Sequence, residues 1–304
     1  MKLPIKLNVA GWPSRFARLT FAFDDPRPLA HDFSSFSRRE FSAAVSPLQF
    51  GVTFKTTHSG RHEHSNRFLL EKYRGSAPVI LDVGASDGST SLDLIHTLEA
   101  NFSRYFVTDL NLWTRCGIGR GGAVYFSDNY GACVLRASKR FLVYSNAAGA
   151  SFPLTLVARR LIARSRKIAD WRDVLLIQPD LLKLMASDAR IMVAPYDMFT
   201  PWTGRRPDVI KIACLLNSRY FSDNQMREAL QMQCSNLALN GRLLLVSEDD
   251  DIEKFSVFRK TPDGMELEHT HAGGAKAAPH VPVADTTLSA SMNLNLDNLR
   301  FMRA

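Results

Sequence analysis

A glycine-rich turn, Gly84-Ala85-Ser86-Asp87-Gly88, holds the residues of this sequence that are best suited to binding a ligand. It follows residues 79–83, an apolar run typical of a strand buried on both faces, and it precedes residues 89–95, which have helical spacing. Because Gly84 and Gly88 lack side chains, the backbone can approach a ligand closely while the first N–H groups of the helix point toward it. The turn therefore predicts a binding site at the end of a buried strand.

A carboxylate ends the next predicted strand. That strand is Tyr105-Phe106-Val107-Thr108-Asp109, and Asp109 follows Gly88 by about twenty residues. In nucleotide-binding α/β units, an acid at this place accepts hydrogen bonds from both ribose hydroxyls. We therefore expect Asp109 to lie beside the glycine turn and to bind the sugar of a nucleoside.

Three later apolar runs, residues 190–199, 207–212 and 240–246, extend this pattern. With Asp82 and the turn, their order and spacing over residues 62–270 resemble the class I S-adenosylmethionine-dependent methyltransferases. The first motif of that family is an acidic residue, an apolar residue and Gly-x-Gly-x-Gly, and Ser86 replaces the middle glycine here. The resemblance implies an α/β, Rossmann-like fold with a mostly parallel seven-stranded sheet and helices on both faces.

The resemblance also implies a place for S-adenosyl-L-methionine across the carboxyl edge of the sheet. The amino-acid moiety would contact the glycine turn, the ribose would contact Asp109, and the adenine would lie beside an Asp-apolar pair after the third strand. The implied cofactor-binding residues are Asp82, Gly84, Ser86, Gly88, Asp109, Asp197 and Met198. Asp82 has a structural alternative, since a carboxylate inside the strand can simply fix the loop.

The sequence assigns no catalytic residue. Methyl transfer from an activated sulfur depends mainly on alignment of the nucleophile and exclusion of water. A general base is needed only if the acceptor must lose a proton, and the candidates are Tyr220, Asn217 and His64. For each of them a structural role is the simpler interpretation. The four cysteines include no C-x-x-C pair, so we expect unpaired thiols and no metal site.

Parts of the second half resemble the chemotaxis-receptor type of methyltransferase, namely residues 215–225, 243–248 and 255–260. Those enzymes carry a Cys-Arg-Asn stretch, then Tyr-Phe, then a helix containing Gln, and a Ser-Glu pair after the fifth strand. Ala213 and Cys214 stand where the Arg-Asn pair would be. The likeness supports the architecture and does not carry over the receptor-glutamate substrate.

A long insertion, residues 112–178, separates the second predicted strand from the helix at residues 179–188. Its first half predicts an antiparallel meander and its second half a basic amphipathic helix over residues 154–168. Loops at the carboxyl ends of parallel strands border the ligand crevice in such folds. We therefore expect this α+β cap to stand beside the mouth of the active site.

The insertion is strongly basic. Residues 129–169 contain no Asp or Glu and eight basic residues, which equals the formal net charge of +8 for the whole chain. This predicts an electropositive surface for an anionic small-molecule or carrier-bound acceptor, or peripheral contact with an acidic membrane surface; nucleic acid is a weaker prediction. The alternative is a solvated helix face that pairs with acids elsewhere, such as residues 249–251.

The remaining segments complete the predicted organisation. Residues 1–61 are expected to form an N-terminal arm with short helices over the core, and residues 62–74 a helix before the first strand. Residues 255–260 and 265–269 predict an antiparallel pair that closes the core at residue 270, and residues 271–304 a linker and tail. No signal peptide or spanning helix is predicted, so we expect a cytoplasmic protein, with any membrane contact at the inner face.

Two other functional interpretations stay open. Gly84-x-Ser86-x-Gly88 after a strand has the form of a nucleophile elbow, which suggests an α/β-hydrolase with Ser86 as nucleophile. The elbow normally lies on the fifth strand, however, and residues 1–76 do not supply the strands. The second is a non-catalytic S-adenosylmethionine-binding or scaffold protein with a degenerate methyltransferase fold, as Ser86 and Cys214 suggest. A nicotinamide-dependent enzyme is disfavoured because the G-x-G-x-x-G register is missing.

Overall fold

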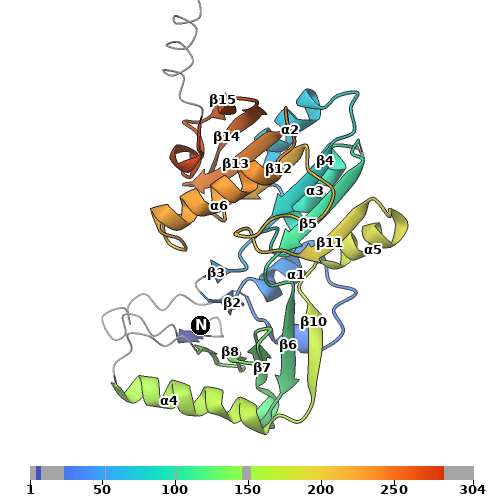
Figure 1. The fold of residues 1–304 in the computed structure, drawn as a ribbon. Coiled ribbons are helices and arrows are strands. Elements are labelled where there is room, and N and C mark those ends of the chain that lie inside the picture. The colour runs from blue at the N-terminus through green and yellow to red at the C-terminus, as the bar shows by residue number, and fades with distance from the viewer. Residues whose placement is uncertain (1–4, 8–23, 52, 100, 146–151, 284–304) are drawn as a thin grey trace, which may run out of the picture. The chain divides into compact units, whose positions relative to one another are not determined.

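The computed structural model describes residues 5–7, 24–51, 53–99, 101–145 and 152–283 (Figure 1). The chain divides into two compact units, Met1–Asp197 and Met198–Ala304. Most of the arm predicted before residue 24, and the tail predicted after residue 283, lie outside the described residues.

The first unit contains three parallel strands that end at one edge. They are β4 (Val79–Val83), β5 (Arg104–Asp109) and β11 (Ile191–Pro195), and β5 pairs with the other two. Every residue of β4 is buried, Asp82 included, as predicted for a strand that is buried on both faces. Helices α2 (Glu63–Lys72), α3 (Ser89–Thr97) and α5 (Pro179–Ser187) accompany these strands. These elements confirm the predicted order of strands and helices.

A second sheet in the same unit is built from the insertion and one N-terminal strand. Its order is β1-β9-β8-β7-β6-β10. The predicted meander is present as β7 (Val124–Ser127), β8 (Cys133–Ala137) and β9 (Phe141–Tyr144). Three strands were not predicted: β6 (Trp113–Ile118), its antiparallel partner β10 (Trp171–Leu175), and β1 (Ile5–Leu7), which runs parallel to β9.

The N-terminal segment packs on this second sheet. Its elements are η2 (Arg27–Ala30), α1 (Arg38–Val45), β2 (Gln49–Phe50) and β3 (Thr53–Phe54). Phe41 and Leu48 are fully buried in one apolar cluster with Phe126, Leu135 and Leu142 of the insertion. The segment also contacts the residues that follow β4 and end β5, through Ser42 to Asp87 and Lys55 to Asp109. Alone, the small sheet could not bury its apolar face, and this segment covers it.

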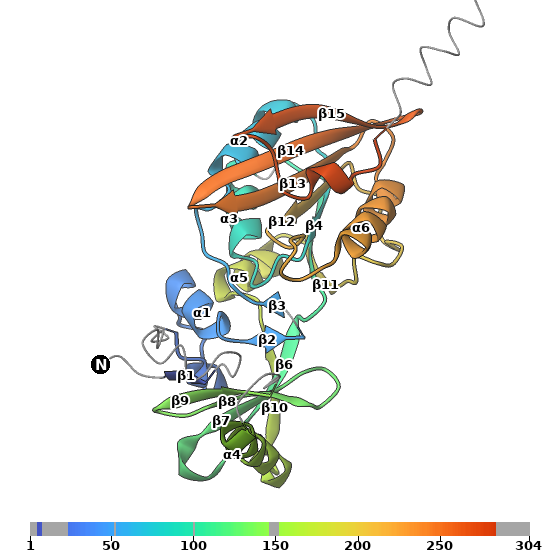
Figure 2. The ribbon, with the colours of Figure 1, turned by 90° about the vertical axis from the view of Figure 1, so that its left-hand side faces the viewer.

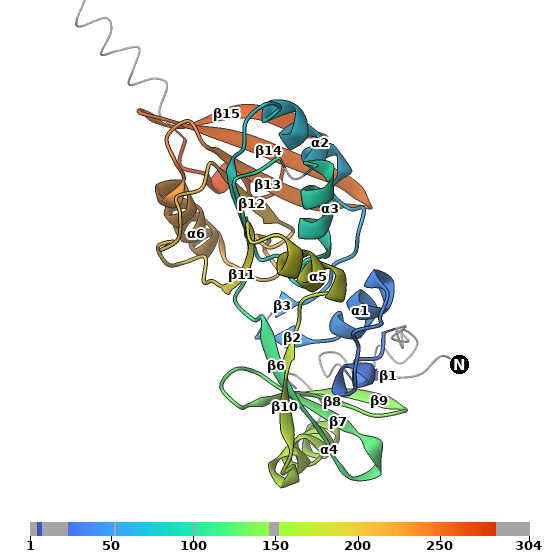
Figure 3. The same ribbon diagram turned by 90° about the vertical axis from the view of Figure 1, so that its right-hand side faces the viewer.

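The basic helix lies on the second sheet. Helix α4 (Phe152–Ala163) and the short η4 (Arg164–Lys167) contact each other, and α4 also contacts β8 and β9. In all three views α4 lies at the opposite end of β6 and β10 from α3 and α5 (Figures 1, 2 and 3). The expectation that the whole insertion would border the ligand crevice is therefore wrong for this helix, because β6 and β10 carry it away from the end of β5.

The second unit forms the other strands of the larger sheet. They are β12 (Val209–Ala213), β13 (Arg242–Asp249), β14 (Ile252–Thr261) and β15 (Gly264–His271), with α6 (Asp223–Asn236) between the first two. A capping box formed by Ser222 and Gln225 begins α6. The strand order is β11-β5-β4-β12-β13-β14-β15. The sheet is mixed, since β14 and β15 are antiparallel to their neighbours.

Two further expectations can be compared with the structure. The linker expected from residue 271 is packed against the second unit: Ala275 and Ala277 are each 5% exposed, and η5 (Ala278–His280) follows them. All four cysteines are unpaired, as predicted. Among the helices within the described ranges, none has the length and apolar character needed to cross a bilayer.

Candidate functional site

The glycine turn and the predicted ribose-binding acid meet in the first unit. The backbone N–H of Ser86 donates to Asp109 Oδ2 at 2.9 Å, and the N–H of Ala85 donates to the Thr108 carbonyl at 2.9 Å. This contact arises because β4 and β5 are parallel neighbours, with Val83 opposite Thr108, so both strands end at the same edge. Two of the residues assigned to one site from the sequence are therefore adjacent.

The turn has three residues with left-handed backbone conformation: Gly84 (φ 74°), Ser86 (φ 60°) and Gly88 (φ 81°). Glycine adopts this conformation at little cost, whereas Ser86 is strained. At Gly88 the absence of a side chain has a packing reason. A Cβ there would lie 2.5 Å from Leu181 Cδ2 of α5, so Gly88 lets α5 approach the turn.

The N-terminus of α3 is capped by the carboxylate of Asp87. The N–H of Ser89 donates to Asp87 Oδ1 at 2.8 Å, and Ser42 Oγ of α1 donates to Oδ2 at 2.6 Å. Burial raises the pKa of Asp87, and the hydrogen bonds from Ser42 and Ser89 act in the opposite direction. The N–H of Ser89 is therefore used inside the protein, contrary to the expectation that the first N–H groups of this helix would face a ligand.

Asp82 holds neighbouring elements together. Its carboxylate is 1% exposed and accepts hydrogen bonds from Ser91 Oγ of α3 at 2.8 Å and from the Tyr105 hydroxyl of β5 at 2.9 Å. Burial, followed by the charge of Asp82, raises the pKa of Tyr105 well above its ordinary value. These contacts match the structural alternative for Asp82.

Lys55, which the sequence analysis did not identify, forms an ion pair with Asp109. Lys55 Nζ is 2.7 Å from Asp109 Oδ1 and 3.4 Å from the Ser86 carbonyl. The two side chains of this ion pair are only 5% and 13% exposed. Lys55 follows β3, 54 positions before Asp109, and no periodicity or motif connects them. Only the fold could have identified this pair.

The hydrogen bonds of Asp109 define what else its carboxylate can accept. A carboxylate has about four acceptor positions. Three are used: Oδ1 by Lys55 and by the N–H of Asn111 at 2.8 Å, and Oδ2 by the N–H of Ser86. Without Lys55, one position would be left on each oxygen. That pair of positions matches the two hydroxyls of a ribose, so the site fits a nucleoside once Lys55 is displaced.

Ser86 supplies a second polar group. Its Oγ is buried and has no hydrogen-bond partner in the part of the chain that the structure describes. A buried hydroxyl without a partner costs free energy unless a ligand or water satisfies it. The same observation opposes a hydrolase: a serine nucleophile needs an exposed Oγ bonded to a base, and neither is present at Ser86 among the described residues.

The other predicted site residues are distributed over both units. Asp197 follows β11, whose last residue Pro195 pairs with Asp109, so its backbone lies at the same edge. Met198 begins the second unit and is 5% exposed. The Asn217 side chain there closes a local turn through the carbonyls of Cys214 and Leu215. Tyr220 lies in the same unit and is half-buried, whereas His64 is exposed on α2 of the first unit.

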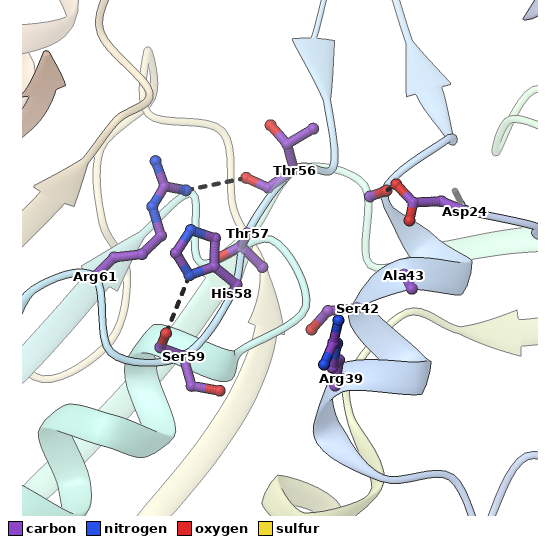
Figure 4. Close-up of a pocket in the computed structure, with 10 residues that line it drawn as sticks. Asp24, Arg39, Ser42, Ala43, Thr56, Thr57, His58, Ser59 and Arg61 are labelled. Atoms are coloured by element: carbon purple, nitrogen blue, oxygen red, sulfur yellow. Dashed lines mark hydrogen bonds between the residues drawn. The ribbon is translucent and has the colours of Figure 1, made fainter. Parts of the chain in front are cut away.

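A pocket of about 620 Å³ lies in the first unit between α1 and residues 56–61 (Figure 4). It was not predicted. Its lining is polar and consists of Asp24, Arg39, Ser42, Ala43, Ser46, Thr56, Thr57, His58, Ser59 and Arg61. Within the described residues, no cluster of His, Cys, Asp and Glu could hold a metal ion.

Comparison with known proteins finds likeness in structure alone: no family model matches the sequence, and no curated protein does. The N-methyltransferase NodS from Bradyrhizobium japonicum WM9, solved with S-adenosyl-l-homocysteine, is 17% identical over 62% of this chain and 62% of its own, with a TM-score of 0.31. The match thus spans under two thirds of NodS.

Two further matches differ in activity. The mitomycin 7-O-methyltransferase MmcR is 13% identical over 80% of this chain and 46% of its own, with a TM-score of 0.34. A structure described as a pericyclic reaction enzyme is 11% identical over 69% and 36%, with a TM-score of 0.31. We therefore base the functional proposal on the residues of the site.

Proposed function

We propose that this chain is an S-adenosyl-L-methionine-dependent methyltransferase. The observation that carries the proposal is the contact between the strained Gly84–Gly88 turn and the Asp109 carboxylate at the carboxyl ends of adjacent parallel strands. This is the place where α/β units bind the ribose of a nucleoside. The order of strands and helices over residues 62–270 supports the same assignment.

The residues of the chain have distinct tasks in this proposal. Asp109 binds the ribose through the two acceptor positions that are available once Lys55 is displaced, and Ser86 Oγ offers a further hydrogen bond. The cofactor supplies a methyl group on a positively charged sulfur, which is already activated for transfer. The protein aligns the acceptor and excludes water. Asp197 and Met198 stay predictions for the adenine side of the site.

The finer assignments are part of the proposal. Tyr220, Asn217 and His64 stay candidates for a general base, and the chemotaxis-receptor type stays the predicted subgroup. The basic residues of α4 and η4 stay a candidate contact for an acidic membrane surface, at about 1 kcal/mol for each basic group near the surface. Their place on the second sheet separates that role from binding of the cofactor.

Calorimetry with S-adenosylmethionine and S-adenosylhomocysteine tests the proposal. Both should bind the wild-type chain. Asp109→Asn removes the charge of the acceptor, and hydrogen bonds to charged groups contribute about 1.5–3 kcal/mol, so its Kd should rise at least roughly tenfold. Asp170→Asn, at an exposed position, is the matched control and should bind as the wild type does.

The outcomes separate the alternatives. If neither nucleoside binds, or if Asp109→Asn binds both as tightly as the wild type, the assignment is refuted. Binding without methyl transfer to any acceptor in a panel would favour the non-catalytic scaffold. Transfer of the methyl group, followed by mass spectrometry of the products, would establish the enzyme.

A further inference from the structure

The pocket between α1 and residues 56–61 has the size and composition of a small-molecule site. Its volume of about 620 Å³ falls inside the range of roughly 300–1,000 Å³ that ligand pockets occupy. Figure 4 shows two walls: Arg39, Ser42 and Ala43 come from α1, and His58 and Arg61 come from the loop opposite. Ala43 is the only apolar residue in the lining, so almost every lining residue can offer a ligand a polar or charged group.

Cations outnumber anions in the lining. The charged lining residues are Arg39, Arg61 and Asp24, and Arg61 also donates to the Thr56 carbonyl at 3.4 Å. Within the described part of the chain, Arg39 forms no ion pair, whereas its neighbour Arg38 pairs with Asp93 and Asp180. Asp24 accepts a hydrogen bond from Ser46 Oγ at 2.7 Å, which satisfies part of its carboxylate. Guanidinium groups bind phosphate and carboxylate with paired N–H donors, and serine and threonine hydroxyls add single hydrogen bonds.

The pocket shares its walls with the candidate cofactor site. Ser42, which lines the pocket, donates to Asp87 of the glycine turn at 2.6 Å and lies 3.1 Å from Ser89 Oγ. Lys55, which pairs with Asp109, directly precedes the lining residue Thr56. The N–H of Gly60 donates to Asp93 Oδ2 of α3 at 2.8 Å and so ties the loop to the helix that begins at the turn.

We propose that this pocket binds a small molecule bearing a phosphate or carboxylate group, held by Arg39 and Arg61. Binding of the anion stands on the pocket itself. Its further role, as the site of the methyl acceptor, rests on the proposed function and on the shared walls described above. The proposal moves the anion site from the basic insertion, where the sequence predicted it, to residues that adjoin the glycine turn.

Inorganic phosphate and acetate are the probes, and each is measured with the full chain in the absence of any nucleoside. Phosphate binding is followed by the line width of its ³¹P NMR signal and acetate binding by saturation-transfer NMR, both at constant ionic strength set with NaCl. Comparing the probes shows whether phosphate or carboxylate is preferred. The variants are Arg39→Gln, Arg61→Gln and the double variant, and circular dichroism and thermal unfolding check that each is folded.

Three further variants act as controls. Arg164→Gln/Arg166→Gln removes two charges from η4 and tests the basic insertion as the anion site. Arg67→Gln removes an exposed charge from α2, where it pairs with Glu63. Asp24→Asn removes the only acid of the lining, and its affinity for either probe should equal or exceed that of the wild type.

The expected result is binding of at least one probe by the wild type, by Arg67→Gln and by Arg164→Gln/Arg166→Gln. Each single pocket variant should bind roughly three- to tenfold more weakly, a loss between those expected for an exposed ion pair and for a charge-assisted hydrogen bond. The double variant should bind more weakly still. The proposal is overturned if the wild type binds neither probe, or if the double variant binds as the wild type does. Because no nucleoside is present, failure of the cofactor assignment would leave this result unchanged.

Discussion

Lys55 gives the most direct test of how the candidate site works. Its ammonium group takes the acceptor position on Asp109 that one ribose hydroxyl would need. A nucleoside must therefore displace Lys55 before both hydroxyls can bind. Replacing Lys55 by Met removes the competing charge and keeps most of the length of the side chain, so we expect Lys55→Met to bind S-adenosylhomocysteine more tightly than the wild type.

The size of the effect follows from the geometry. The pair is 2.7 Å apart, with exposures of 5% and 13%, so water screens it less than a surface pair. A hydrogen bond to a charged group contributes about 1.5–3 kcal/mol, against at most about 1 kcal/mol for an exposed ion pair. If the ligand no longer has to break this bond, its Kd should fall by roughly 10- to 150-fold. The ligand-free variant should lose stability of similar magnitude.

A double-mutant cycle isolates the competition. Titration calorimetry with S-adenosylhomocysteine would compare the wild type, Lys55→Met, Asp109→Asn and the double variant. The gain from Lys55→Met should disappear in the Asp109→Asn background, because the two substitutions act on the same hydrogen bond. Lys139→Met, at an exposed position in the turn between β8 and β9, is the matched control and should leave the Kd unchanged.

Weaker or unchanged binding by a folded Lys55→Met variant would refute this reasoning. It would mean that Lys55 stays in place and contributes to the ligand, or that the ribose does not use Asp109. A gain of equal size in the Asp109→Asn background would also contradict it, because the lysine would then be acting through another group.

Three other predictions follow from the packing and the pKa shifts. Gly88→Ala should destabilise the protein by about 2–4 kcal/mol in denaturant unfolding, because the new Cβ would meet Leu181 at a positive φ, and Leu181→Ala in the same background should recover part of the loss. The pKa of Asp87 is raised above the unfolded value of about 3.9, so the contribution of Asp87 to stability is largest at low pH. The unfolding free energy of the wild type relative to Asp87→Asn should therefore fall as pH rises from about 4 through the folded pKa. A difference that stays constant with pH would contradict this. Burial raises the pKa of Cys133 to about 11 and that of Cys234 to about 12, so iodoacetamide at pH 8 should alkylate them at least about 100-fold more slowly than in the unfolded chain, as followed by mass spectrometry.

The sequence predicted the elements whose signal is local. The apolar run of β4, the helical spacing after Gly88 and the meander of the insertion all correspond to elements of the structure. Because β4 and β5 are parallel neighbours, knowing both strands is enough to bring the glycine turn and Asp109 to one edge. This part of the site could be predicted for that reason.

Contacts between distant segments could not be predicted in the same way. Strand β6 has exposed Trp113 and Ile118 at its ends and glycine inside, so its sequence resembles a loop, and only pairing with β10 makes it a strand. The pair between Lys55 and Asp109 joins positions 54 residues apart. The cap of α3 by Asp87 depends on burial against Ser42. None of these pairings leaves a pattern in the chain itself.

The segment from Lys55 to Arg61 connects the two proposed binding sites, and this has a thermodynamic consequence. Lys55 holds the acid of the nucleoside site, and the next residue, Thr56, already lines the anion pocket. Consecutive Cα atoms are held about 3.8 Å apart, so any movement of the Lys55 backbone that accompanies its release from Asp109 is passed on to Thr56. The affinities for nucleoside and anion should therefore be coupled, and each ligand must change the Kd of the other by the same factor. In Lys55→Met the nucleoside displaces no lysine, so this coupling should vanish while both ligands still bind. Equal coupling in the wild type and in Lys55→Met would show that the two sites communicate by another route.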